Sequence, residues 1–266
     1  MGGAVGNFIA LGDYDIIAYL MVGLAMFMVF DLVLGTGFLY RTNWNTGSVT
    51  GIVLLAYLGG HLISIPANWL FEVKLVSSCL KQPVVHLVPA AAGSAQQGSS
   101  TACSVITWLS PSHFTKPATN DVLARIAARS ESAPPQAAAT SDAERAARDD
   151  ALFHEAFITA KRDANSYDRM MIFQRLYLLF RNMGFLAFSA LVAVVIKHAL
   201  TRFGVWHSDR HLIYYGVKPW MISFWGQFSM FLLLSLGLFD RFLFFYRLYA
   251  LEVMSAYAYA WPVPDR

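Results

Sequence analysis

Four stretches of the chain carry hydrophobic residues almost without interruption, and each is long enough to cross a lipid bilayer. They cover residues 16–39, 51–71, 178–200 and 220–239. A helix rises about 1.5 Å per residue, so roughly 20 apolar residues span the hydrocarbon layer. The pattern therefore predicts an all-α integral membrane protein with four transmembrane helices.

The connection between the second and third stretches is more polar and predicts a separate region. Residues 88–119 are rich in Ala, Gly, Ser and Pro, which indicates irregular structure. Two helices should follow it. Asn120 caps the first, and Ser141 with Glu144 forms the S-x-x-E capping box of the second. We therefore expect an insertion of irregular and helical structure over residues 88–165.

These boundaries divide the chain into three predicted parts. They are an N-terminal transmembrane hairpin (1–87), the insertion (88–165) and a C-terminal transmembrane hairpin (166–266). In the last part no helix breaker precedes the third stretch after Ser166, and none follows the fourth stretch before Pro262. Both C-terminal helices should therefore extend past the membrane as long cytoplasmic stalks.

The composition supports a membrane location. Hydrophobic residues make up 56% of the 266-residue chain and charged residues only 14%, whereas soluble domains carry about 25% charged residues. The two cysteines, Cys79 and Cys103, have no zinc-ligand spacing. If their connection lies in the reducing cytoplasm, both should be free thiols.

The distribution of Lys and Arg predicts the orientation. Residues 40–50, between the first two stretches, hold only Arg41, whereas the connection 73–177 holds eleven Lys and Arg residues. Cytoplasmic loops carry an excess of these residues. Both termini and the long connection should therefore be cytoplasmic, although the loop 201–219 also carries three basic residues.

Five polar side chains share one face of the predicted second helix. They are Tyr57, His61, Ser64, Asn68 and Glu72. At about 100° per residue these positions fall within about 80° of arc. Polar groups in lipid cost free energy, so this face should contact protein or water.

Hairpin geometry predicts that two further polar groups join this face. If the first loop is centred near Asn45, Asp31 and His61 lie about equally far from it and should meet at one depth. Gln227, near the start of the fourth stretch, should lie at a similar level. An acid, an imidazole and an amide could then form one cluster.

Three interpretations of this cluster stay open. It is a buried network that fixes helix packing, a water-filled path for protons or ions, or an enzyme or cofactor site. No residue is singled out as catalytic, because Ser64 lacks a G-x-S-x-G motif. No metal site is indicated, because His-x3-His and Glu-x-x-His pairs are missing from the stripe. No particular cofactor is indicated either.

A repeated motif stands at the predicted cytoplasmic boundary. "FQRLYLLFR" (173–181) and "FDRFLFFYR" (239–247) share the pattern F-x-R-x4-[FY]-R, which contains Arg175, Arg181, Arg241 and Arg247. Aromatic and basic residues form ordinary belts at membrane interfaces. The alternative is that these arginines bind an anion or a protein partner.

These features favour an oligomeric, channel-like or membrane-effector protein controlled by its cytoplasmic region. An alternative is a non-catalytic accessory subunit of a larger membrane complex, and a third is an intramembrane enzyme built around Asp31 and His61. The expected partners are the lipid bilayer and copies of the chain or other membrane subunits. Nucleic acid is not an expected partner.

Overall fold

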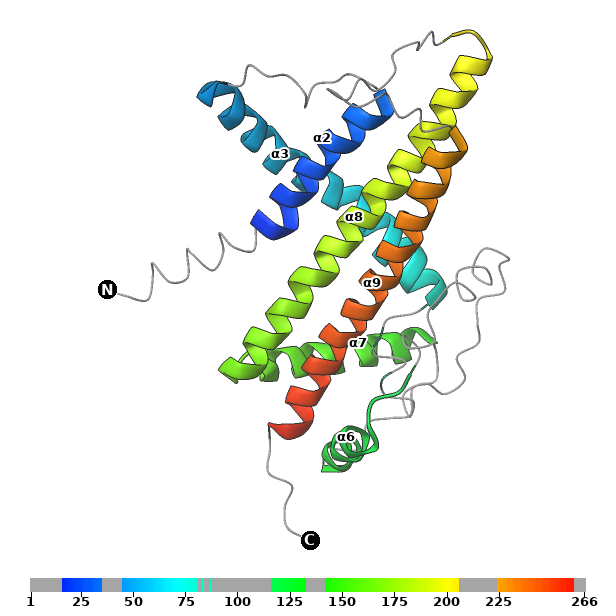
Figure 1. The fold of residues 1–266 in the computed structure, drawn as a ribbon. Coiled ribbons are helices and arrows are strands. Elements are labelled where there is room, and N and C mark those ends of the chain that lie inside the picture. Colours follow the sequence, from blue (N-terminus) through cyan, green and yellow to red (C-terminus); the bar gives the residue numbers. More distant parts are fainter. Residues whose placement is uncertain are drawn as a thin grey trace. The chain divides into compact units, whose positions relative to one another are not determined.

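The structure is a computed structural model that describes residues 16–34, 45–80, 83, 87, 116–132, 142–205 and 224–260. In this part of the chain it is 93% helical and contains no strand, which confirms the all-α class. In chain order the elements are η1 (Ile16–Leu20), α2 (Met21–Leu34), α3 (Thr46–Ala67), η3 (Asn68–Leu80), α6 (Asn120–Ser132), α7 (Asp142–Ala160), α8 (Ala164–Arg202) and α9 (Phe224–Tyr259) (Figure 1). The elements η1 and η3 are π-helices.

Three of the described helices are long and apolar enough to cross a membrane. They are the continuous helix Thr46–Leu80, formed by α3 and η3, together with α8 and α9. The first predicted span is represented by a shorter apolar helix, Ala18–Leu34. Residues 35–39 of that span lie outside the described residues, so a count of four spans stays a prediction.

The chain separates into two compact units. Unit 1 comprises Met1–Phe71 and Leu178–Phe242, and unit 2 comprises Glu72–Tyr177 and Leu243–Arg266. The apolar parts of both predicted hairpins belong to unit 1, so the units differ from the three parts predicted from the sequence. The divisions fall close to the predicted span ends at residues 71, 178 and 239.

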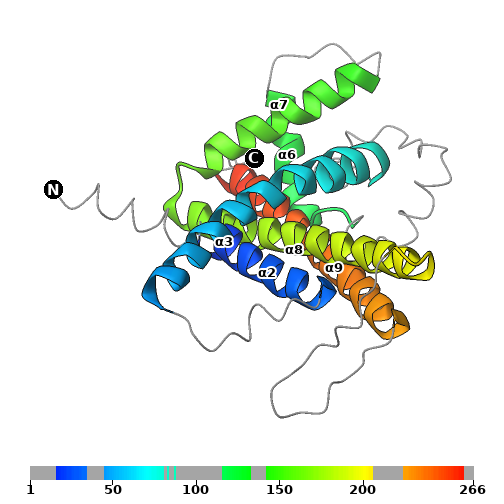
Figure 2. The same ribbon diagram turned by 90° about the horizontal axis from the view of Figure 1, so that it is seen from above.

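In unit 1, α2 crosses α3 with the two backbones in contact (Figures 1 and 2). A Cβ atom added to Gly23 would overlap the carbonyl of Ala56, and one added to Gly60 would overlap the carbonyl of Tyr19. Small residues permit this approach, which gains dispersion contacts in lipid, where apolar burial provides no drive. The contacts also fix the register of the two helices.

The rest of unit 1 packs α2 and the end of α3 against α8 and α9. Val33 forms a buried cluster with Ala190, Val194 and Phe231. In the same region the Lys197 ammonium on α8 donates a hydrogen bond of 2.7 Å to the Val33 carbonyl, one residue before α2 ends. A cation is favourable there, because the last carbonyls of a helix carry partial negative charge.

In unit 2, α7 packs with the first part of α8 and the last part of α9. Tyr177 contacts Tyr246 and Tyr249, with ring centroids 5.1 and 5.6 Å apart, and Phe153 contacts Tyr249. Polar pairs lie around this aromatic group. Arg169 Nε lies 2.9 Å from Glu252 Oε1.

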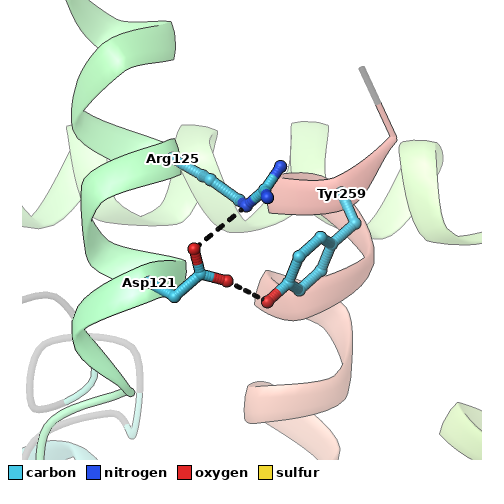
Figure 3. Close-up of polar contacts among 3 residues, drawn as sticks. All are labelled: Asp121, Arg125 and Tyr259. Atoms are coloured by element: carbon cyan, nitrogen blue, oxygen red, sulfur yellow. Dashed lines mark hydrogen bonds and ion pairs between the residues drawn. The ribbon is translucent and has the colours of Figure 1, made fainter. Parts of the chain in front are cut away.

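Further polar contacts in unit 2 attach three parts of the chain to α9. These are α7, α6 and residues 116–119, which directly precede α6. Tyr257 donates to Glu155 across 3.1 Å. The Tyr259 hydroxyl donates to Asp121, which also pairs with Arg125 at 3.3 Å (Figure 3). Arg247 completes the attachment by donating hydrogen bonds to the carbonyls of Lys116 and Pro117.

The helix boundaries follow capping chemistry that the sequence displays in part. The side chain of Asn45 accepts a 2.7 Å hydrogen bond from the Ser48 amide at the start of α3. Asp163 accepts one of 3.1 Å from the Ser166 amide and so caps α8. Such caps satisfy amides that have no partner within the helix.

Candidate functional site

The candidate site is centred on Arg181, a buried arginine of α8 that is 5% exposed. Its Nη2 donates to Ser64 Oγ at 2.9 Å, and its Nη1 donates to Asn68 Oδ1 at 3.2 Å. Its Nε donates to Asn182 Oδ1 at 3.2 Å. All five N–H groups of a guanidinium lie in one plane, so these bonds hold its orientation.

A pocket of about 710 Å³ opens beside this guanidinium. Its lining residues are Leu58, His61, Leu62, Ser64, Ile65, Asn68 and Arg181, all of them in unit 1. Leu62 and Ile65 are 68% and 70% exposed, and Leu58 is also exposed. The pocket thus has a cationic polar end and an apolar wall formed by one side of α3.

His61 is held at the pocket by two aromatic rings. The Tyr19 ring stacks on the imidazole with centroids 3.8 Å apart and planes at 17°, and the Tyr57 ring meets it edge-on at 4.7 Å. The close approach of Gly60 to the Tyr19 backbone brings η1 next to α3. The glycine contact therefore positions the ring that packs on His61.

The local sequence of α3 explains why Ser64 and Asn68 reach the same guanidinium. They are four residues apart in a helix, so they lie on one face. Pro66, inside α3, has no amide to donate, and the helix widens to π-hydrogen bonding from Asn68. The Asn68 amide bonds to the carbonyls of Ile65 and Ser64 at this junction.

Glu72 is the predicted stripe residue that does not belong to unit 1. It lies in the π-helix η3, which begins at Asn68. Glu72 belongs to unit 2 and is not among the residues that line the pocket. Of the five predicted stripe residues, His61, Ser64 and Asn68 line the pocket and Tyr57 contacts His61, whereas a place for Glu72 in the stripe stays a prediction.

The predicted contact between Asp31 and His61 is not formed. Tyr19 stacks directly on His61. Asp31 lies twelve residues further along the run formed by η1 and α2, which is a rise of about 18 Å. The prediction is wrong because α2 ends at Leu34, which centres the connection earlier than Asn45.

Two other predicted site residues, Asp31 and Gln227, do not line the pocket. Asp31 is buried on α2, and Gln227 is half-buried on α9. Neither lines the pocket at Arg181. The predicted cluster of acid, imidazole and amide is therefore not assembled at this pocket.

The four motif arginines have different surroundings. Arg175 and Arg247 belong to unit 2, and Arg247 binds backbone carbonyls there. Arg241 is in unit 1, where its exposed side chain lies 4.0 Å from Asp240. Only Arg181 lines the pocket. A shared ring of these arginines in an oligomer stays an untested prediction.

The link between Arg181 and the α3 stripe was not predicted, although both were identified separately. Their contact joins residues 117 and 113 positions apart in the chain. One sequence signal could have found it. Asn68 lies near the end of the second apolar stretch and Arg181 near the start of the third, which places both at the same predicted membrane boundary.

The sequence analysis also misjudged Cys79, which lies in η3. It is disulfide-bonded, so the expectation of a free thiol is wrong for this residue. The other cysteine of the chain, Cys103, lies outside the described residues. Disulfides persist in oxidising compartments, so this bond bears on the orientation of the chain.

Chemically, the site presents a planar cation to whatever enters the pocket. Ser64, Asn68 and Asn182 are neutral acceptors that orient the guanidinium. Asn182 is fully buried, and its amide nitrogen has no hydrogen-bond partner among the described residues. No protein-family model, curated protein or solved structure matches this chain. The site geometry therefore carries the functional argument.

Proposed function

We propose that this chain is an integral membrane effector protein that binds an anionic ligand in the pocket at Arg181. One observation carries the proposal. A buried guanidinium, held by Ser64 and Asn68, lines a pocket of about 710 Å³ in the apolar unit of the chain. Charged residues within membrane segments are costly, and those that persist there usually serve a ligand or ion site.

The guanidinium favours a carboxylate, phosphate or sulfate group as the ligand. Its planar fork donates two parallel hydrogen bonds to such groups, and charge-assisted bonds are roughly twice as strong as neutral ones. In the low-dielectric surroundings of a membrane unit the attraction is screened less than in water. Binding of the anion would change the contacts between α3 and α8, which is how we propose the effector responds.

The other functions expected from the sequence are less well supported. An enzyme built on Asp31 and His61 is not proposed, because the register of α2 and α3 separates them. An oligomeric channel and an accessory subunit remain proposals that the oligomeric state in mild detergent would distinguish. A channel would purify as a symmetric homo-oligomer, whereas an accessory subunit would be monomeric or unstable alone.

For the topology, we propose from the Lys and Arg distribution that both termini and the long connection are cytoplasmic. The disulfide at Cys79 argues for the opposite orientation, because the cytoplasm keeps thiols reduced. The proposal predicts that a cytoplasm-dependent reporter is active when fused at Arg266 and silent within residues 42–47. The reverse result, with Cys79 oxidised in intact cells, would overturn it.

The binding proposal is tested with the purified full chain in a neutral detergent. Thermal unfolding is followed with added sodium phosphate and with sodium chloride at matched ionic strength. A ligand at ten times its Kd stabilises the folded state by about 1.4 kcal/mol, so phosphate should raise the melting temperature. Arg181→Lys should weaken this response, because a lysine ammonium lacks the bidentate fork.

Arg202→Lys is the matched control. Arg202 is exposed at the end of the same helix, in the same unit, and does not line the pocket. This variant should respond to phosphate as the unmodified chain does. Equal phosphate responses in the unmodified chain, Arg181→Lys and Arg202→Lys would refute an anion site at Arg181.

A further inference from the structure

We propose, on the basis of the proposed anion site, that the ligand is an anionic phospholipid of the bilayer. Its phosphate would bind Arg181 at the polar end of the pocket. One acyl chain would lie along the wall formed by Leu58, Leu62 and Ile65 of α3. The inference names a membrane lipid in preference to a soluble anion, and three observations support it.

The first observation is the order of polar and apolar residues along α3. Asn68 and Ser64 meet the guanidinium with Ile65 between them in height, and Leu62 and Leu58 lie further away along the helix, on either side of the level of His61. From Asn68 to Leu58 the helix rises about 15 Å. This distance is half of the roughly 30 Å hydrocarbon layer, which is the depth of one leaflet. A single phospholipid matches both the polarity and the length of this wall.

The second observation is the exposure of the apolar wall. Leu62 and Ile65 are 68% and 70% exposed beside a buried cation. A soluble phosphate ion would occupy the cationic end and leave these side chains uncovered. An acyl chain covers them, so a ligand with both a phosphate and a hydrocarbon chain complements the whole pocket.

The third observation is the depth of Arg181. The third apolar stretch starts at residue 178, so Arg181 lies in its first turn. Lipid phosphates occupy this depth of a bilayer, and basic pockets between transmembrane helices are known to bind lipid headgroups. The same guanidinium at the centre of a span would be out of reach of a headgroup.

The test uses the full chain purified in neutral detergent and mixed with one of two lipids. The probes are phosphatidylglycerol, which is anionic, and phosphatidylcholine, which has no net charge. Native mass spectrometry measures the fraction of protein that retains each lipid. Phosphatidylglycerol should be retained more strongly, and Arg181→Lys should lower its apparent affinity by about tenfold, as expected for losing one charge-assisted hydrogen bond.

Variants of the wall distinguish a bound lipid from a free anion. Ile65→Ser and Leu62→Ser should lower phosphatidylglycerol retention and leave the stabilisation by inorganic phosphate unchanged. Leu233→Ser is the matched control, because Leu233 on α9 is also 70% exposed in unit 1 and does not line the pocket. It should retain phosphatidylglycerol as the unmodified chain does.

The outcomes separate the two proposals. If inorganic phosphate stabilises the protein but Ile65→Ser and Leu62→Ser retain lipid normally, the anion site stands and the lipid inference fails. If Leu233→Ser loses as much lipid as Ile65→Ser, retention reflects general lipid contact, and the inference also fails. If Arg181→Lys matches the unmodified chain with lipid and with phosphate, both proposals fail. Gel filtration and circular dichroism confirm that each variant is folded.

Discussion

The contacts inside unit 1 differ in kind from the contacts inside unit 2. In unit 1 the α2 and α3 backbones touch at two glycines, and apolar residues of α2, α8 and α9 form the cluster around Val33. In unit 2 the aromatic group around Tyr177 is accompanied by ion pairs and tyrosine hydrogen bonds that attach α6 and α7. The polar contacts of unit 1 include the pocket at Arg181, whereas those of unit 2 join α6 and α7 to α9.

This difference fits the solvents that the sequence predicts for the two units. Between lipid-covered helices the hydrophobic effect gives little drive, so close backbone packing provides the stabilisation. In water, apolar burial drives folding. Surface ion pairs add a small stabilising free energy that depends on salt and pH. Steric changes should therefore disturb unit 1 most, and changes of salt or pH should act on unit 2.

The largest expected effect comes from Gly23→Ala. The added methyl group would overlap the carbonyl of Ala56, so the α2 and α3 backbones must move apart. Overpacking of this kind costs up to about 3 kcal/mol. We expect a large fall in the melting temperature in detergent, measured by circular dichroism. His61 should also become accessible to chemical modification as Tyr19 moves away.

Gly51→Ala and Gly237→Ala are the controls for this prediction. A Cβ at either position meets no atom within 4 Å. Both glycines lie inside helices of unit 1, where alanine is favoured by about 1 kcal/mol. These variants should be neutral or more stable. A similar loss of stability in all three would show that α2 and α3 do not approach at Gly23.

A smaller effect is expected from the pair Arg169–Glu252 in unit 2. The two side chains are 63% and 18% exposed, so solvent screens their attraction. The coupling free energy from a double-mutant cycle with Arg169→Ala and Glu252→Ala should be below about 1 kcal/mol. In 1 M salt the Debye length falls to about 3 Å, and the coupling should disappear. A coupling that survives this salt would place the pair in surroundings that exclude water.

The smallest expected effect is the response of α6 to acid. The hydrogen bond from Tyr259 and the charge of Arg125 lower the pKa of Asp121 below its ordinary value of 3.8, against a smaller opposing effect of burial. A lowered pKa stabilises the folded state above the ordinary pKa. This stabilisation is lost as the pH falls from 3.8 through the lowered value.

Hydrogen exchange of α6 amides measures this response. Exchange, corrected for its intrinsic pH dependence, should accelerate as the pH falls below 3.8. Asp121→Asn should remove that acceleration while keeping an oxygen that accepts from Tyr259. The Asp121→Asn variant is needed because a second carboxyl group also has a lowered pKa. A hydrogen bond from Ser166 lowers the pKa of Asp163, just before α8. An unchanged acid response in Asp121→Asn would assign the effect to another carboxylate.

The sequence predicted what depends on neighbouring residues. Apolar stretches gave the long helices, and the capping signals placed α7 one residue after Ser141 and α6 from Asn120. The polar face of α3 was also recognisable from Tyr57 to Asn68, because it follows ordinary α-helical spacing. These features need only local periodicity and turn chemistry.

The sequence could not predict what depends on pairing between distant elements. The register of α2 and α3 is set by backbone contact at Gly23 and Gly60, not by the loop between them, so the Asp31–His61 prediction failed. The π-helix η3, which begins at Asn68, has no clear residue signature. The contact of Arg181 with Ser64 required knowing that α8 packs beside α3.

Lys197 has a consequence for the order in which the helices enter the membrane. It places an ammonium group within the third apolar stretch, and by insertion scales such a charge costs about 2.5–3.5 kcal/mol at a helix centre and less near an end. Its hydrogen bond to the Val33 carbonyl offsets part of that cost, but only when α2 is already present. We therefore expect the N-terminal hairpin to favour the insertion of α8 during synthesis. A chain that lacks α2 should leave α8 outside the bilayer more often.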